Sequence, residues 1–263
     1  MGQAKYQNDG DPRTSGPGFG VTCHEDLLAD PLTWRRPRTV FVNSMSDIAH
    51  ARVPRAFVAQ TWAVMALARQ HTFQVLTKRP KRLAAMMAGP GFARQIGQAA
   101  TEIISRTPHG VWRTDMTGWT PEGSTGDCVW MPPWPLPNTW VGTSIETDDY
   151  TWRADVLRQV PASTRFLSLE PLLGPLPSLD LTGIDWVIVG GESGPDHRPV
   201  DMAWIREIRD RCLGAGVPFF FKQVGGSTPK AGGRELDGRT WDQYPTKMIG
   251  GRPSCPATAR SSR

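Results

Sequence analysis

The sequence lacks the short cysteine and histidine patterns that hold metals. Its four cysteines, Cys23, Cys128, Cys212 and Cys255, lie far apart, and no two have the C-x-x-C spacing of a zinc or iron–sulfur site. Its five histidines show no ligand spacing. There is also no G-x-S-x-G nucleophile motif, no Walker phosphate loop and no H-E-x-x-H motif. Several common hydrolytic and metal-dependent mechanisms are therefore weakly supported.

Long apolar runs and a secretory signal are missing as well. We therefore expect no membrane partner, no disulfide framework and a cytoplasmic location. With 263 residues, of which 39% are hydrophobic and 21% charged, the chain can bury a sizeable core. This length suits one large α/β barrel or two smaller domains.

The charge balance is mildly basic. Lys and Arg number 30 against 25 Asp and Glu, which gives a formal net charge of +5 and a pI of about 9.3. Such an excess permits a nucleic-acid or phosphorylated partner without requiring one, because many basic enzymes bind no nucleic acid.

The sequence does contain a repeated unit, a short apolar run that ends in polar residues. The clearest example is Trp186 to Gly194, Trp-Val-Ile-Val-Gly-Gly-Glu-Ser-Gly. A β-branched run of this kind predicts a strand buried on both faces, as in a parallel sheet. The two glycines predict a point where a ligand approaches the backbone closely.

Similar runs recur along the chain, and most are followed by apolar residues at helical spacing. The predicted strands cover residues 39–43, 73–77, 139–143, 165–169, 186–190 and 217–221, and the predicted helices cover 54–65, 80–89, 92–106, 152–160 and 201–214. Asp148 or Asp149 is predicted to cap the fourth helix, and Asp201 the fifth.

Repeated strand–helix units predict an α/β fold in which a parallel sheet closes partly into a TIM-like (β/α) barrel. An open doubly wound sheet is the alternative. Residues 39–225 are predicted to form the barrel, preceded by an irregular arm at 1–38 and followed by a polar tail at 226–263. Residues 107–137 are predicted to form an irregular insertion. Its tryptophans either anchor it on the core or line a pocket.

In such barrels the functional groups gather where the strands end. The polar residues at these ends could hold an amino acid-like or phosphate-bearing ligand by charge-assisted hydrogen bonds, although any one of them could instead cap a helix. The candidate cofactor-binding residues are Asn43, Ser44, Ser46, Asp47, Thr77, Lys78, Ser144, Glu146, Glu170, Gly190, Gly191, Glu192 and Lys222, with Arg79, Ser168, Ser193 and Gln223 beside them.

Several segments resemble a family of phage and prophage proteins of unknown function that looks like a radical S-adenosylmethionine barrel. The resemblance covers nearly the whole chain, in order. It is carried by Phe41–Asp47, Phe73–Pro80, Glu170–Gly174, Trp186–Gly194, Phe219–Gln223 and Gly232–Trp241.

The resemblance implies S-adenosylmethionine as a cofactor, an electron donor as a partner, and a [4Fe–4S] cluster. The family holds this cluster with three cysteines in an N-terminal loop that ends in Cys-Tyr-Ala. This sequence has no such loop, and its opening, Met1–Tyr6, is similar to a stretch that follows the loop in the family. We therefore expect no cluster on this chain, which lacks the first strand and is either a shortened form or the product of a start site placed too late. By position, Asn43–Asp47 is the best candidate for holding the methionine part of the cofactor.

Two other functions stay open. One is a cluster-free barrel that binds nucleic acid or a phage protein partner. The other is a hydrolase in which Glu146 pairs with Glu170 or Glu192 for acid–base work.

Overall fold

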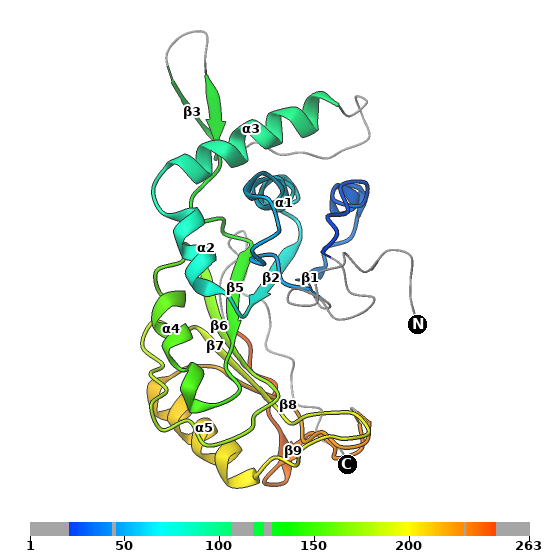
Figure 1. The fold of residues 1–263 in the computed structure, drawn as a ribbon, viewed down its shortest axis with the longest axis vertical. Helices are drawn as coiled ribbons and strands as arrows, with labels where there is room; N and C mark the ends of the chain where they lie inside the picture. Colours follow the sequence, from blue (N-terminus) through cyan, green and yellow to red (C-terminus); the bar gives the residue numbers. More distant parts are fainter. Residues whose placement is uncertain (1–20, 44–45, 107–117, 124–127, 229, 246–263) are drawn as a thin grey trace, which may run out of the picture. The chain divides into compact units, whose positions relative to one another are not determined.

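The computed structural model describes residues 21–43, 46–106, 118–123, 128–228 and 230–245 (Figure 1). The chain divides into two compact units, Met1–Leu136 and Pro137–Arg263. Among the described residues, no helix is long and apolar enough to cross a membrane.

The first unit is built on two parallel strands, β1 (Thr39–Val42) and β2 (Thr72–Thr77), with Thr39 opposite Thr72. Its helices are the 3₁₀ helix η2 (Asp30–Thr33), α1 (Arg55–Leu67), α2 (Pro80–Met87) and α3 (Gly91–Ser105). Helix α1 is apolar around most of its circumference and is almost fully buried, because η2 and α3 both pack against it.

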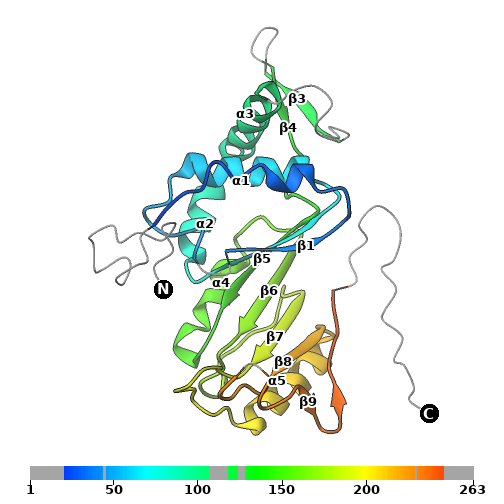
Figure 2. The ribbon, with the colours of Figure 1, turned by 90° about the vertical axis from the view of Figure 1, so that its right-hand side faces the viewer.

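The described part of the predicted irregular insertion contains a small antiparallel hairpin, β3 (Thr120–Glu122) with β4 (Val129–Met131). This hairpin lies against α3 (Figure 2), where a side chain at Gly97 would overlap the backbone carbonyl of Trp130. Trp119 is buried and the Trp134 ring meets Phe92 edge-on, so these two tryptophans anchor the segment. Residues 107–117 and 124–127 of the insertion lie outside the described residues.

The second unit contains four parallel strands paired in chain order. They are β5 (Thr139–Ser144), β6 (Thr164–Leu169), β7 (Trp186–Gly190) and β8 (Phe219–Gln223). Helix α4 (Trp152–Leu157), preceded by the 3₁₀ helix η3 (Asp148–Tyr150), connects β5 to β6, and α5 (Met202–Ala215) connects β7 to β8. Because parallel crossovers are right-handed, α4 and α5 lie on the same face of these strands (Figure 1).

The described residues of this unit place no helix on the opposite face of β5–β8, which we call the helix-free face. The side chains on this face change in character along the strands. Strand alternation and register place aromatic side chains at its amino end and polar side chains at its carboxyl end. The aromatic residues are Trp140, Phe166, Trp186 and Phe220, and the polar residues are Ser144, Ser168, Glu170 and Lys222. Trp186 contacts the rings of Trp140, Phe166 and Phe220, so the amino end is a packed aromatic cluster.

Part of the predicted polar tail folds onto the second unit as a two-stranded hairpin, β9 (Glu235–Leu236) with β10 (Arg239–Thr240). Leu236 is buried, and the Trp241 ring packs edge-on against Phe219 of β8. The hydrophobic residues of this segment therefore extend the core of the second unit.

The predicted α/β fold with parallel strands is confirmed, and every predicted strand and helix forms with small shifts at its ends. The predicted cap of α5 is confirmed, because the Asp201 side chain accepts a hydrogen bond from the backbone of Ala203. The predicted cap of α4 is wrong: Thr151 occupies that position, and both carboxylate oxygens of Asp148 accept hydrogen bonds from Ser178.

Candidate functional site

The second unit gathers polar groups where β6, β7 and β8 end. Glu170 follows β6, Gly191 and Ser193 follow β7, and Lys222 and Gln223 close β8. We call these five residues the β6–β8 edge cluster. Their carboxylate, hydroxyl, amide, ammonium and carbonyl groups contact one another directly, as predicted from parallel strands that end at one edge.

Gln223 is the centre of the edge cluster. Its amide nitrogen donates to Glu170 Oε1 at 3.2 Å, to the Gly191 carbonyl at 3.2 Å and to Ser193 Oγ at 2.8 Å. The Lys222 ammonium binds the other carboxylate oxygen of Glu170 at 2.8 Å. The cluster therefore holds one carboxylate between a cation and an amide.

A β-bulge explains how two neighbouring residues of β8 reach the same carboxylate. Val189 pairs with Phe221, but Gly190 pairs with Gln223, so Lys222 is an extra residue on β8. The extra residue interrupts the alternation that would point Lys222 and Gln223 to opposite faces. The Lys222 side chain is 51% exposed and the Glu170 side chain 19%, so the ion pair is open to solvent on its lysine side.

The two glycines after β7 serve contacts within the chain. A side chain at Gly191 would overlap the carbonyl of Val224, and one at Gly190 would press on the Glu170 carboxyl group at 3.1 Å. The approach of a ligand to the backbone at these glycines stays a prediction. The glycines admit the loop that follows β8 and the carboxylate that the edge cluster holds.

Glu192 closes its own loop. Its carboxylate accepts three hydrogen bonds from Arg198, two from the guanidinium at 2.7 Å and one from the backbone at 2.9 Å. These bonds lower the pKa of Glu192 to about 2. The predicted binding residue Glu192 is thus a fully bonded clamp for the loop between β7 and α5.

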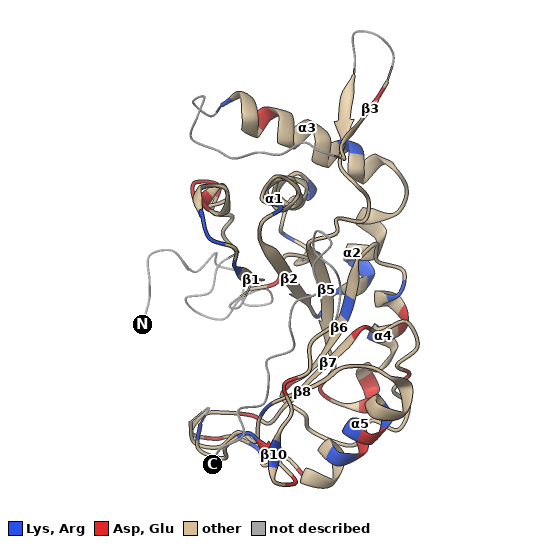
Figure 3. Cartoon of the chain, turned by 180° about the vertical axis from the view of Figure 1, so that it is seen from behind, with Lys and Arg blue, Asp and Glu red and all other residues tan. Residues whose placement is uncertain are grey.

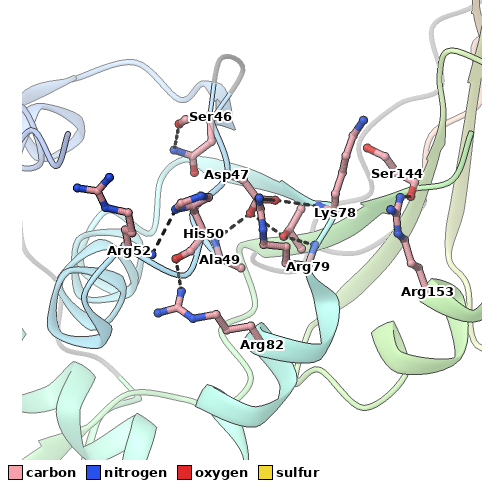
Figure 4. A network of polar contacts seen from close by, with 12 residues as sticks. Ser46, Asp47, Ala49, His50, Arg52, Lys78, Arg79, Arg82, Ser144 and Arg153 are labelled. Carbon is pink, nitrogen blue, oxygen red and sulfur yellow. Dashed lines mark hydrogen bonds and ion pairs between the residues drawn. The ribbon is translucent and has the colours of Figure 1, made fainter. Parts of the chain in front are cut away.

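Glu146 and Ser144, at the end of β5, are tied to helix α4. The buried guanidinium of Arg153 donates to the Ser144 carbonyl at 2.8 Å, and both residues are labelled in Figure 4. It also donates to Glu146 Oε2 at 3.0 Å. The guanidinium also lies 4.0 Å from the centre of the Tyr150 ring. Glu146 therefore connects the end of β5 to α4. Removing either partner of this buried ion pair would leave the other charge without a counterion.

In the first unit, Asp47 accepts hydrogen bonds from several surrounding groups (Figure 4). Its carboxylate accepts hydrogen bonds from the Thr77 hydroxyl at 2.7 Å and from the backbone of Ala49 and Lys78 at 2.9 and 3.0 Å. The Arg79 guanidinium adds an ion pair at 3.0 Å. An internal carboxylate therefore occupies the anion position at the end of β2 and the start of α2.

The same network restrains the loop that follows β1. Arg82 donates through its two terminal nitrogens to the carbonyls of His50 and Val53. Burial, followed by the nearby Arg79 charge, lowers the pKa of the His50 imidazole. The loop thus contains a buried neutral histidine that the sequence did not single out.

Asn43 ends β1 in the left-handed backbone region, with φ of 72°, a conformation that asparagine tolerates better than most residues. Its side-chain nitrogen donates to Ser46 Oγ at 2.9 Å. Its buried Oδ1 has no hydrogen-bond partner in the part of the chain that the structure describes. Ser44, also a predicted binding residue, lies outside the described residues.

Eight of the predicted site residues thus fall into three bonded groups, whereas Glu192 pairs with Arg198 and Asn43 with Ser46. Glu170, Gly191 and Lys222 meet in the edge cluster, Ser144 and Glu146 meet at Arg153, and Asp47, Thr77 and Lys78 meet in the first unit. Sequence reasoning missed the cations Arg153 and Arg198. Arg198 follows its carboxylate partner by six residues and Arg153 by seven, and that short spacing along the chain is the signal that could have found them.

The fold and these networks define an α/β protein with parallel strands whose polar groups collect at the strand ends. The chain matches, over residues 3–245, the family described as "Protein of unknown function (DUF5131)", and it belongs to that family. No curated protein and no solved structure shows a significant match to it.

Proposed function

We propose that this protein binds a small ligand with an α-amino-acid group at the β6–β8 edge cluster. The observation that supports this proposal most directly is the position of the Glu170 carboxylate. It lies between the Lys222 ammonium and the Gln223 amide at the carboxyl edge of a parallel sheet. S-adenosylmethionine is the ligand of this kind that the sequence resemblance names. The phage origin and the relationship to radical S-adenosylmethionine barrels are part of this proposal.

The edge cluster suits a zwitterion because it contains both charges in exchangeable form. A ligand ammonium can take the place of Lys222 at Glu170, and the released Lys222 can bind the ligand carboxylate. The Ser193 hydroxyl and the Gln223 amide supply further neutral partners, 2.8 Å apart. The exchange conserves the number of charge-assisted bonds, so it does not leave a partly buried carboxylate unpaired.

The aromatic cluster at the amino end of the helix-free face is closed to a ligand, because Trp140, Phe166 and Trp186 are buried and pack on one another. The proposed site is therefore the polar carboxyl end of these strands, where the Lys222 side chain is exposed.

The described cysteines do not fit an iron–sulfur cluster. Cys212 is buried in α5, and burial raises the pKa of its thiol to about 12, which disfavours the thiolate that iron requires. Burial and the nearby Glu25 also raise the pKa of Cys23. Within the described residues, no three cysteine, histidine or carboxylate side chains form a group that could hold a metal ion. We therefore derive no radical step for this chain and propose ligand binding alone.

The acid–base alternative receives no support from the strand-end carboxylates. Glu146 pairs with Arg153, Glu170 with Lys222 and Glu192 with Arg198. A carboxylate that acts as a general acid at neutral pH needs surroundings that favour its protonated form, whereas a neighbouring cation favours the ionised form.

Calorimetric titration of the full chain with S-adenosylmethionine, S-adenosylhomocysteine and methionine tests the proposal. Lys222→Met and Glu170→Gln each remove one charged partner, and we expect each to weaken binding about 10- to 100-fold. Asp155→Asn, which alters an exposed carboxylate paired with Arg158 in the same unit, is the matched control and should change affinity less than about 2-fold. Absence of binding by the wild type, or equal losses in the control, would overturn the proposal.

A further inference from the structure

The formal charge of the protein is unevenly distributed along the chain. Residues 1–136 carry 15 Lys and Arg against 10 Asp and Glu, whereas residues 137–263 carry 15 of each. The net excess of +5 therefore belongs to the first unit, Met1–Leu136. A polyanionic partner would be attracted to this unit.

Much of this positive charge is already used within the first unit. Arg79 pairs with Asp47, and Arg82 binds two backbone carbonyls. Arg35 and Arg36, by contrast, are exposed and pair with no acidic side chain in the described parts of the chain. They lie in the segment Trp34-Arg-Arg-Pro-Arg38, just ahead of β1, where Figure 3 shows basic residues in blue.

The backbone of this segment is held in place although its arginines are exposed. The fully buried His71, at the start of β2, accepts a hydrogen bond from the Arg38 backbone through Nδ1 at 3.1 Å. Its Nε2 lies 2.9 Å from the Pro31 carbonyl, to which it can donate. Gln70 also donates to the Trp34 carbonyl at 3.3 Å. The charged segment is therefore presented from a fixed position.

Two aromatic side chains accompany the arginines. The Arg38 guanidinium lies 4.7 Å from the centre of the Trp34 ring. Phe41 of β1 is 44% exposed, on the outward face of the strand that it shares with the exposed Thr39. Three residues of extended chain place the Cα atoms of Arg38 and Phe41 about 10 Å apart. We call Trp34, Arg35, Arg36, Arg38 and Phe41 the arginine–aromatic strip.

We propose that the arginine–aromatic strip binds single-stranded nucleic acid. Unpaired guanidinium groups bind backbone phosphates, and an exposed aromatic ring stacks on an unpaired base. A duplex keeps its bases stacked on one another, so the exposed Phe41 ring favours a single strand. The strip shares no residue with the edge cluster, so variants of the one test this proposal apart from the ligand site proposed for the other.

Fluorescence anisotropy of the full chain with labelled 12-nucleotide oligo-dT and oligo-U, at about 100 mM salt, tests this inference. Replacing Arg35 and Arg36 together by Gln removes two phosphate contacts and should weaken binding about 20-fold. Phe41→Ala removes one stacking platform and should weaken it about 10-fold. A 12-base-pair duplex should bind more weakly than either single strand.

The matched control replaces Arg94 and Arg106 by Gln. Arg94 lies in α3 and Arg106 follows its last residue; both are exposed and in the same unit, so the net charge changes by the same amount. We expect this control to change affinity less than about 2-fold, and circular dichroism to show the same fold for every variant. Equal losses in both arginine pairs, unchanged binding by Phe41→Ala, preference for the duplex, or no binding by the wild type would each overturn the proposal.

Discussion

Gly142 in the middle of β5 is fixed by its neighbour across the sheet. It lies opposite Phe166 of β6, and a side chain at Gly142 would overlap the buried Phe166 ring. Phe166 in turn packs against Trp186, so its ring has little room to move. The glycine is therefore part of the aromatic packing on the helix-free face.

Gly142→Ala should destabilise the protein, because the added methyl group must displace the Phe166 ring from a packed cluster. We expect a loss of about 1–3 kcal/mol in the free energy of unfolding, measured by urea denaturation. Gly174→Ala is the control, since that glycine has open space around its missing side chain and no positive φ. The control should stay within about 1 kcal/mol of the wild type. An equal loss in both variants would contradict the packing role of Gly142.

Two glycines show a limit of what the sequence alone could predict. The polar residues after β7 were correctly placed at a strand end, but the sequence did not reveal the contacts within the chain that Gly190 and Gly191 make. The contact that explains Gly191 comes from Val224, more than 30 residues away along the chain. A glycine that admits another part of the backbone has the same local pattern as one that admits a ligand, so the sequence could not distinguish them.

At the scale of helices and strands, the local signals were sufficient. Apolar runs of strand length predicted β1, β2 and β5–β8, and helical spacing predicted α1 to α5. These signals depend on neighbours in sequence, which is why they could be read directly. The cap of α4 failed because the carboxylate of Asp148 is recruited by Ser178, 30 residues further along the chain.

The N-terminal cap of helix α5 is expected to contribute measurably to the stability of the protein. The Asp201 side chain accepts the Ala203 backbone hydrogen at 2.8 Å, and Gly216 ends the helix in the left-handed region with φ of 67°. Asp201→Ala leaves that backbone group without its partner and should lower the free energy of unfolding by about 1 kcal/mol. Asp201→Ser keeps an oxygen at the capping position and should retain most of that stability in the same denaturation experiment. A loss as large for Ser as for Ala would show that the carboxylate acts through something other than capping.

At the scale of the whole molecule, two kinds of chemistry are assigned to different units. The edge cluster of the second unit pairs Glu170 with Lys222, a local arrangement of opposite charges. The arginine–aromatic strip of the first unit contains exposed cations of one sign. Composition predicted a basic protein, but only the division into units showed that the excess charge lies in residues 1–136.

Salt should separate these two activities in the intact protein. If about three phosphates contact the strip, raising the salt concentration from 50 to 200 mM should weaken oligo-dT binding about 20-fold, because each contact releases condensed counterions. Binding of S-adenosylmethionine should change less than about 3-fold over the same range, since a small ligand has no such counterion atmosphere and its amino-acid group exchanges within a partly buried ion pair. Anisotropy for the oligonucleotide and calorimetry for the small ligand measure both on one preparation. A steep salt dependence of the small ligand would mean that it binds by net charge alone and not at a site that matches both of its charges. If oligo-dT binding did not weaken with salt, contacts to the phosphates would not contribute to it, and the proposed role of Arg35 and Arg36 would be wrong.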